Sequence, residues 1–203
     1  TMRAAQQAGL SLGDYIDAKY NVPGTTEETI ARMAELGAFD NRPQRICEIG
    51  PGSGRYLVHI KRLTNPQLYE IYETAAPWRD YLVETHGVVA GRTDGQTLAD
   101  TPAASVDLVH SHKVFVGLPI FTTLHYFTEI ARVVRVGGKA VFDIQSENCL
   151  DDAMLERWLE MREPYAKSIV PKDWALAFFA RRGFRFDGAF KITMLPGVTE
   201  YLV

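Results

Sequence analysis

The chain has little of what marks disulfide-rich, membrane-spanning or nucleic-acid-binding proteins. Its only cysteines are Cys47 and Cys149, too few for a disulfide framework, which favours a reducing, cytoplasmic compartment. No apolar run reaches the roughly 20 residues of a membrane span, and no signal segment opens the chain. Its 22 basic residues are outnumbered by 25 acidic ones, without the clustered positive charge that binds a phosphate backbone. We therefore expect neither a membrane nor a nucleic acid as partner.

The composition is that of an ordinary globular domain. Apolar residues make up 46% and charged residues 23% of the 203 positions, enough for one sizeable core. No repeat, low-complexity tract or Gly/Ser linker divides the chain, so we predict a single domain over 1–203. The order of its segments distinguishes four parts. These are a helical N-terminal cap (1–40), a core (45–144), a helical insert that is a candidate lid (146–170), and a closing helix and strand pair (171–203).

Short apolar runs alternate with helical stretches from Arg45 onward. The runs are rich in β-branched and aromatic residues and nearly continuous, as expected for strands covered on both faces. Strand and helix in alternation predict a parallel sheet with right-handed crossovers. The predicted strands are 45–49, 67–73, 87–92, 106–111 and 138–144, and the predicted helices between them are 54–63, 76–85 and 120–135, the last ending at a Gly137-Gly138 C-cap.

The alternation of single strands and helices ends after residue 145. Two helices are predicted at 151–163 and 171–181, and two strands at 184–190 and 198–203 then meet across the turn Leu195-Pro196-Gly197. Strands joined without a helix must run antiparallel. We therefore predict an α/β fold: a doubly wound, mostly parallel seven-stranded sheet with an antiparallel last strand and helices on both faces.

The strongest motif is a glycine-rich loop between the first predicted strand and its helix. Glu48 ends the apolar run, and Gly50, Gly52 and Gly54 follow at alternating positions. Dinucleotide sites use G-x-G-x-x-G, but here Arg55 stands where that third glycine would be. A carboxylate two residues before the first glycine suits a cation, such as a sulfonium or an amino-acid ammonium, better than a pyrophosphate. The loop therefore favours a nucleoside amino acid as ligand.

On these residues the chain resembles the class I S-adenosylmethionine-dependent methyltransferases, whose first motif is acidic-x-Gly-x-Gly-x-Gly. The resemblance covers the core and agrees with the closing strand pair, and it implies S-adenosylmethionine as cofactor. It assigns Glu73, 23 residues beyond Gly50 at the tip of the second strand, to the ribose hydroxyls. It assigns Asp94 and Gly95, after the third strand, to the adenine, and Ser111, ending the fourth strand, to the cofactor. A solvated acid at Glu73 and a plain Asp-Gly turn are the alternatives.

Two histidines stand where the resemblance places the donor methyl group. Methyl transfer chiefly needs alignment of donor and acceptor, and a base only where a hydroxyl must lose its proton. His112 is the predicted base because it comes later and reaches further into the cleft, with His110 as the second candidate. Packing against the cofactor is the alternative for His112. Asp107, near the start of the strand, is a poor third ligand for a metal, so we predict no metal site.

Two segments outside the core are expected to shape the acceptor pocket. In the family, residues before the first strand often fold over the cofactor, so Tyr15 or Tyr20 is a candidate for contact with its methionine end. In the insert, Trp158, Met161 and Tyr165 suit a lid that excludes water, although their spacing also fits ordinary core packing. Neither segment carries a recognisable motif for the acceptor.

These features predict a methyltransferase acting on a small-molecule acceptor, a hydroxyl of the sugar or secondary-metabolite type. Ser111-His112-Lys113-Val114 follows the fourth strand in place of the Asn/Asp-Pro-Pro-aromatic run of many amino-group methylases. Two alternatives stay open, namely a nicotinamide-dependent oxidoreductase on a related sheet and a non-catalytic protein that binds S-adenosylmethionine. The sequence leaves the oligomeric state open.

Overall fold

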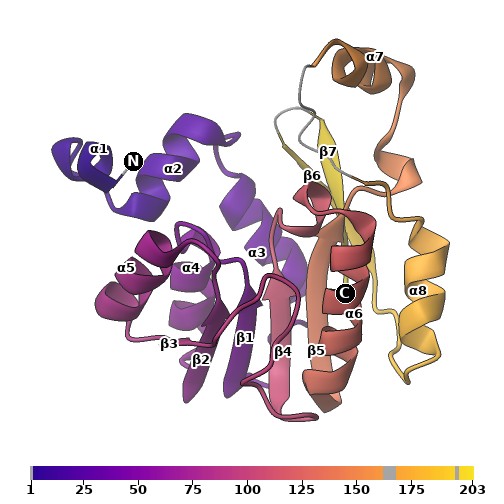
Figure 1. Ribbon diagram of the computed structural model, residues 1–203, viewed down its shortest axis with the longest axis horizontal. Coiled ribbons are helices and arrows are strands. Elements are labelled where there is room, and N and C mark those ends of the chain that lie inside the picture. Colours follow the sequence, from indigo (N-terminus) through magenta and orange to yellow (C-terminus); the bar gives the residue numbers. More distant parts are fainter. Residues whose placement is uncertain (1, 162–167, 195–196) are drawn as a thin grey trace.

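The computed structural model describes residues 2–161, 168–194 and 197–203, which form one α/β domain (Figure 1). A seven-stranded sheet lies at its centre, with helices on both faces. The first half of the chain contributes α1 (Met2–Gln7), α2 (Leu12–Tyr20), α3 (Thr25–Glu35), β1 (Arg45–Ile49), α4 (Arg55–Thr64), β2 (Leu68–Tyr72), α5 (Ala76–His86) and β3 (Val89–Ala90). The second half contributes β4 (Val106–Ser111), α6 (Ile120–Val133), β5 (Val134–Ile144), α7 (Asp152–Glu160), α8 (Lys172–Ala180), β6 (Ala189–Thr193) and β7 (Val198–Leu202).

The strand order is β3-β2-β1-β4-β5-β7-β6. β7 runs antiparallel to both of its neighbours, and the other six strands share one direction, so the predicted fold class is confirmed. The chain leaves β1 toward β2 and β3 on one side and later returns to β4 on the other. This reversal makes the carboxyl ends of β1 and β4 the switch point at which such sheets bind ligands.

Alternation along the strands divides the core into two layers. Ile46 packs with Leu57 of α4 on one face, and its neighbour Cys47 packs with Phe127 of α6 on the other. The first layer is covered by α3, α4 and α5, and the second by α6 and α8. In Figure 1, α1 and α2 lie beyond one end of the sheet near β1 and β2, and α7 lies beyond the same end near β6 and β7.

The Gly137-Gly138 pair is not a helix C-cap. α6 ends at Val133 and β5 begins at once, so both glycines lie inside a strand. Between Val106 and Leu108 of β4, the partner on β5 jumps from Val134 to Lys139, which is a bulge. A Cβ on Gly138 would lie 2.9 Å from the Val106 carbonyl oxygen. The glycine therefore allows a close approach of two backbones and does not end a helix.

Several predicted boundaries also differ. β3 is two residues long instead of the predicted 87–92, and β6 begins at Ala189 instead of 184. Leu195 and Pro196 of the predicted turn lie outside the described residues, but the strands they join are paired antiparallel as expected. The three helices of the N-terminal cap are present as predicted. Among the described residues, no helix is long and apolar enough to cross a membrane.

Asp107 joins the amino-terminal ends of three strands, and this predicts its effect on stability. Its carboxylate accepts hydrogen bonds from the backbone N–H groups of Gln44 and Arg45 and pairs with Arg135 of β5. We expect Asp107→Ala to lower the free energy of unfolding by about 2 kcal/mol, because two backbone donors lose their acceptor. Urea denaturation measures this loss. Glu35→Ala, which breaks an exposed pair with Arg32, serves as control and should cost less than about 0.5 kcal/mol. Equal losses would contradict the role of Asp107.

Candidate functional site

The glycine loop makes a tight bend directly after β1. Gly50 and Gly52 both have positive φ, 64° and 55°, a conformation that other residues adopt only with strain. A Cβ on Gly50 would lie 2.5 Å from a methyl carbon of Val114, and one on Gly52 would lie 3.0 Å from the ring of Trp78. The loop thus packs against the segment after β4 and against α5 with no room for side chains. The loop follows β1 at the switch point, where we expect a ligand to approach.

Glu73 brings the loops after β1 and β2 together. It is buried, and its two carboxylate oxygens accept hydrogen bonds from the backbone N–H groups of Gly52 and Ala75, at 2.9 and 2.8 Å. A carboxylate has about four lone-pair directions, so roughly two remain for further donors. Beside a side-chain-free bend, those two positions suit a pair of ribose hydroxyls. The residues present therefore fit the predicted cofactor.

The other predicted cofactor contacts have local partners. Asp94 is exposed, and its carboxylate caps the turn that follows it by accepting from the backbone of Gln96 and Thr97. The hydrogen bond from the Gln96 backbone is the main reason that the pKa of Asp94 lies below its ordinary value. Gly95 has a φ of 81° inside that turn. Ser111 is fully buried and donates to the Ile49 carbonyl, which joins β4 to β1. Their contacts with a cofactor stay predictions.

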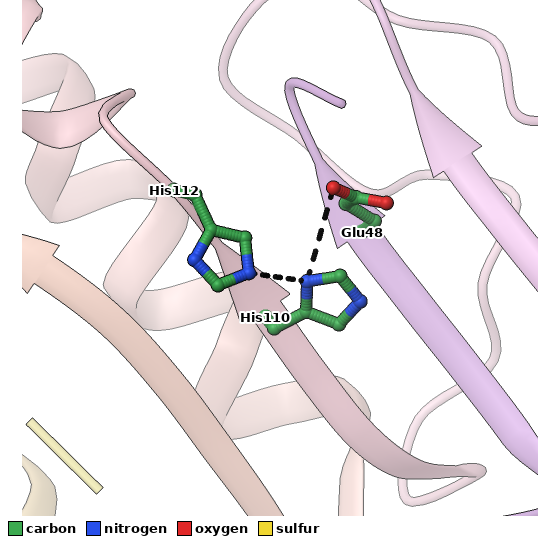
Figure 2. Close-up of side chains that lie close together, drawn as sticks. All are labelled: Glu48, His110 and His112. Atoms are coloured by element: carbon green, nitrogen blue, oxygen red, sulfur yellow. Dashed lines mark hydrogen bonds and ion pairs between the residues drawn. The ribbon is translucent and has the colours of Figure 1, made fainter. Parts of the chain in front are cut away.

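Glu48 belongs to a buried chain of polar side chains. Its Oε2 accepts a hydrogen bond from the Tyr69 hydroxyl at 2.8 Å, and that hydroxyl lies 2.8 Å from Nε2 of His110. Nδ1 of His110 lies 3.0 Å from Nε2 of His112, and Nδ1 of His112 lies 3.2 Å from the Tyr201 hydroxyl. This row of hydrogen-bonded side chains therefore links β2, β1, β4 and β7 on the face covered by α3 and α4. Figure 2 shows Glu48 and both histidines turned toward one another.

Burial is the main cause of the pKa shifts of Glu48, His110 and His112. It raises the pKa of Glu48 to about 8 and lowers the pKa of His110 to about 3. It also lowers the pKa of His112 well below its ordinary value. Both imidazoles are therefore neutral near pH 7. Burying a polar group costs free energy, and the hydrogen bond that each of these side chains makes offsets part of that cost.

We predicted that His112 reaches into the cleft, but its side chain is buried. It is 7% exposed, and its ring stacks on Tyr56 with the ring centroids 3.7 Å apart. Tyr56 comes from the first turn of α4, directly after the glycine loop, and covers the imidazole. The structure thus brings His112 next to His110 and Glu48 and encloses all three. Their catalytic role stays a prediction.

Side chains of the N-terminal cap contact the residues that follow the glycine loop and β4. Asp17 of α2 pairs with Arg55 at the start of α4, at 2.7 Å, and Asn21 accepts a hydrogen bond from Lys113 at 3.1 Å. Tyr15 accepts a hydrogen bond from Lys19 on its own helix, and Tyr20 is 54% exposed. Thr26 of α3 also accepts a hydrogen bond from Arg55, at 3.4 Å. That the cap folds over the cofactor, with Tyr15 or Tyr20 at its methionine end, stays a prediction.

The insert is partly described. Trp158 of α7 is half-buried, and its indole N–H has no hydrogen-bond partner among the described residues. Met161 is 37% exposed, and Tyr165 lies outside the described residues. Met154 of α7 packs against Gly197 before β7, which anchors the helix to the sheet. The predicted lid is therefore held at its start, and its function stays a prediction.

Sequence reasoning did not find the tyrosines that complete the buried chain. Tyr69 and Tyr201 lie in strands where an aromatic residue is ordinarily core. Lys113 and Asp143 also escaped notice. The backbone N–H of Lys113 donates to Asp143, and burial raises the pKa of Asp143 to about 6 and lowers that of Lys113 to about 8. The feature that leads to the buried tyrosines is the pairing of His110 in β4 with Glu48 in β1.

Comparison with known structures gives the same fold. A sarcosine dimethylglycine methyltransferase, described as putative, from Galdieria sulphuraria is 16% identical, with a TM-score of 0.62 over 82% of this chain and 63% of its own. An O-methyltransferase family protein from Burkholderia thailandensis is 15% identical, with a TM-score of 0.65 over 87% of this chain and 55% of its own. This chain thus spans less than two thirds of the length of either protein.

A third similar structure is the magnesium protoporphyrin IX methyltransferase from Synechocystis with bound S-adenosylhomocysteine. It is 13% identical, with a TM-score of 0.62 over 88% of this chain and 83% of its own. No curated protein sequence matches this chain. The profile of a family described as a methyltransferase domain matches residues 20–186. The predicted family and its S-adenosylmethionine cofactor are confirmed: the chain belongs to a family of methyltransferase domains.

Proposed function

We propose that this methyltransferase domain transfers a methyl group to a hydroxyl oxygen of a small molecule, of the sugar or secondary-metabolite type. The observation that carries the transferase assignment is the meeting of the glycine bend and Glu73 at the switch point between β1 and β4. S-adenosylmethionine supplies an activated methyl group on a good leaving group. The task left to the protein is therefore to hold donor and acceptor in line.

The described residues divide this task between backbone and side chains. The loop from Gly50 to Gly54 would hold the methionine portion against its backbone, which packs closely on Val114, Trp78 and Leu82 because the glycines carry no side chains. The free lone pairs of Glu73 would accept the ribose hydroxyls, and Asp94 would accept from the adenine amino group. Two fixed points on the nucleoside set the direction of its sulfur. The donor is thereby aligned at the carboxyl ends of the strands.

A small acceptor is supported by the way the cleft is enclosed. The cap lies over the glycine loop through Asp17 and Asn21, and α7 lies beyond the same end of the sheet (Figure 1). The net charge of −3 gives no attraction to a polyanion. We infer that these elements exclude water from the reacting atoms once donor and acceptor are bound, which favours a compact acceptor.

A hydroxyl acceptor is supported by the residues that follow β4. Ser111-His112-Lys113-Val114 lacks the two prolines of many amino-group methylases. Both ring nitrogens of His112 already have partners in His110 and Tyr201, so an acceptor would have to displace one of them to use the imidazole as base. Alignment is therefore the main contribution that we assign to the described residues.

Binding and turnover test this proposal on the full chain. We expect S-adenosylhomocysteine to bind by isothermal titration calorimetry and NAD⁺ not to bind, because the bend has the wrong spacing for a pyrophosphate. Transfer of a radiolabelled methyl group would then be screened on matched sugar and phenol hydroxyls and on the corresponding amines. Methylation of amines alone would overturn the hydroxyl assignment. Binding without turnover on any acceptor would favour a non-catalytic protein, and binding of NAD⁺ would favour an oxidoreductase.

Gly52→Ala tests whether the shape of the glycine loop matters for cofactor binding. The added methyl group lies 3.0 Å from the Trp78 ring, so the loop or the ring must shift, and alanine is forced to a φ of 55°. Gly87→Ala is the matched control, since its φ is 61° and nothing lies within 4 Å of the added Cβ. We expect each substitution to cost about 1 kcal/mol of stability, and only Gly52→Ala to weaken S-adenosylhomocysteine binding, by tenfold or more in calorimetry. Unchanged affinity in Gly52→Ala would remove the loop from the site.

Glu73→Gln tests the ribose contact. The change removes the charge and replaces one acceptor oxygen by a donor that faces a backbone N–H. We expect affinity for S-adenosylhomocysteine to fall by about 1–3 kcal/mol, which is roughly 5- to 150-fold. Glu84→Gln, on the exposed side of α5, removes the same charge without touching the site and should leave affinity unchanged. Equal affinities in the two variants would make Glu73 a purely structural residue.

A further inference from the structure

Glu48, His110 and His112 turn three metal-binding atoms toward one point. Glu48 Oε1, His110 Nδ1 and His112 Nε2 all lie within 4.8 Å of one another, and all three residues are buried (Figure 2). His110 Nδ1 stands between the other two, at 3.0 Å from His112 Nε2 and 3.9 Å from Glu48 Oε1. The atoms come from β1, from the end of β4, and from the residue just after it. The sheet therefore fixes their positions.

The spacing of these atoms fits a first-row divalent cation. Zinc binds imidazole nitrogen and carboxylate oxygen at about 2.0–2.2 Å, so two ligand atoms of a tetrahedral site lie about 3.3 Å apart. Two of the three separations, 3.0 and 3.9 Å, lie on either side of that value, and the third, between Glu48 and His112, is within 4.8 Å. Two imidazoles and a carboxylate are a set that zinc uses, with a fourth position left for water or a substrate oxygen.

The opposite side of each ligand is held by a tyrosine. Nε2 of His110 and Oε2 of Glu48 share the hydroxyl of Tyr69, and Nδ1 of His112 meets the hydroxyl of Tyr201. Outer partners of this kind are a regular feature of metal-binding histidines, because they fix the tautomer and aim the free lone pair at the ion. If both tyrosine oxygens accept from the imidazoles, both inner nitrogens present lone pairs at 3.0 Å. Such a pair is repulsive unless a cation lies between them.

The position of Glu48 Oε1 supports a cation as well. Oε1 faces His110 Nδ1 at 3.9 Å, which is beyond hydrogen-bond distance, in a pocket where the side chain is 1% exposed. A proton shared between the histidines would complete a neutral chain of hydrogen bonds but would leave this oxygen facing a lone pair. Buried carboxylates are ordinarily paired or bound to a metal. A divalent ion at the centre of the three atoms satisfies every one of them.

We propose that Glu48, His110 and His112 form a buried site for a divalent transition metal, with Zn²⁺ the best match. The sequence analysis assigned no metal because it sought a third ligand near Asp107 and gave Glu48 to the cofactor. In this site the histidines bind the ion, in place of the proton-accepting role predicted for them. The ion would link β1 to the segment after β4 directly below the glycine loop.

Metal content of the full chain tests the site without any measurement of activity. The chain would be produced in medium supplemented with zinc, dialysed against a mild chelator, and analysed by inductively coupled plasma mass spectrometry. We expect close to one zinc per chain in the unaltered protein. Glu48→Gln, which preserves size and most hydrogen bonding, is expected to lose nine tenths or more of the metal, and His112→Asn the same. His59→Gln and His125→Gln remove histidines elsewhere and should keep it.

A second measurement protects the test from failure to fold. Far-UV circular dichroism would establish that each variant is folded, and thermal unfolding with and without added Zn²⁺ would be compared. We expect zinc to raise the melting temperature of the unaltered chain and of His59→Gln, and to leave Glu48→Gln unchanged. Two outcomes would overturn the site: a folded chain that neither holds nor gains zinc, or a Glu48→Gln variant that holds as much as the unaltered chain. Since no cofactor is present, neither outcome bears on methyl transfer.

Discussion

The parallel pairing of β1 with β4 is the constraint on which the rest of the molecule depends. It places Glu48 beside His110 and Ile49 beside Ser111, and it brings the two strand ends together at the point where the strand order reverses. The glycine bend begins at one of these ends, and the polar segment from His112 begins at the other. A shift of one residue in this register would turn Glu48 and His110 to opposite faces. The same backbone hydrogen bonds between β1 and β4 thus fix the positions of the glycine loop and of the buried Glu48 and His110.

This arrangement buries polar groups at the centre of the sheet, where they carry a cost. Burial is the main cause that raises the pKa of Glu48 to about 8, while its hydrogen bond to Tyr69 acts in the opposite direction. Apolar residues of the same size would pack there more cheaply, so stability does not explain their presence. Hydrogen bonds between buried polar groups do fix one geometry, since each bond tolerates little movement. The buried side chains of Glu48, His110 and His112 therefore favour a binding role over a packing role.

The sequence predicted what depends on local pattern. The glycine bend after β1, the alternation of strand and helix, and the antiparallel ending all follow from residue types within a few positions. What it could not predict depends on contacts across the sheet. The burial of His112 requires Tyr56, from another element, to stack on its ring. Gly138 resembled a helix C-cap because its true neighbour, the Val106 carbonyl, lies 32 residues away in sequence. The hydrogen bond from Tyr69 to Glu48 could not be predicted because the two residues are 21 positions apart, and the cofactor contact of Glu48 stays a prediction.

The choice of acceptor must be made outside the sheet. The carboxyl ends of the strands are occupied by the glycine bend, by Glu73 and by the buried chain, which leaves the cap and the insert to form the remaining walls. Asp17 and Asn21 hold the cap to Arg55 and Lys113, residues that directly follow the bend and β4. A change in the cap would therefore alter the position of both loops. We propose that the cap takes part in selecting the acceptor, because it is joined to Arg55 and Lys113, which follow the glycine bend and β4.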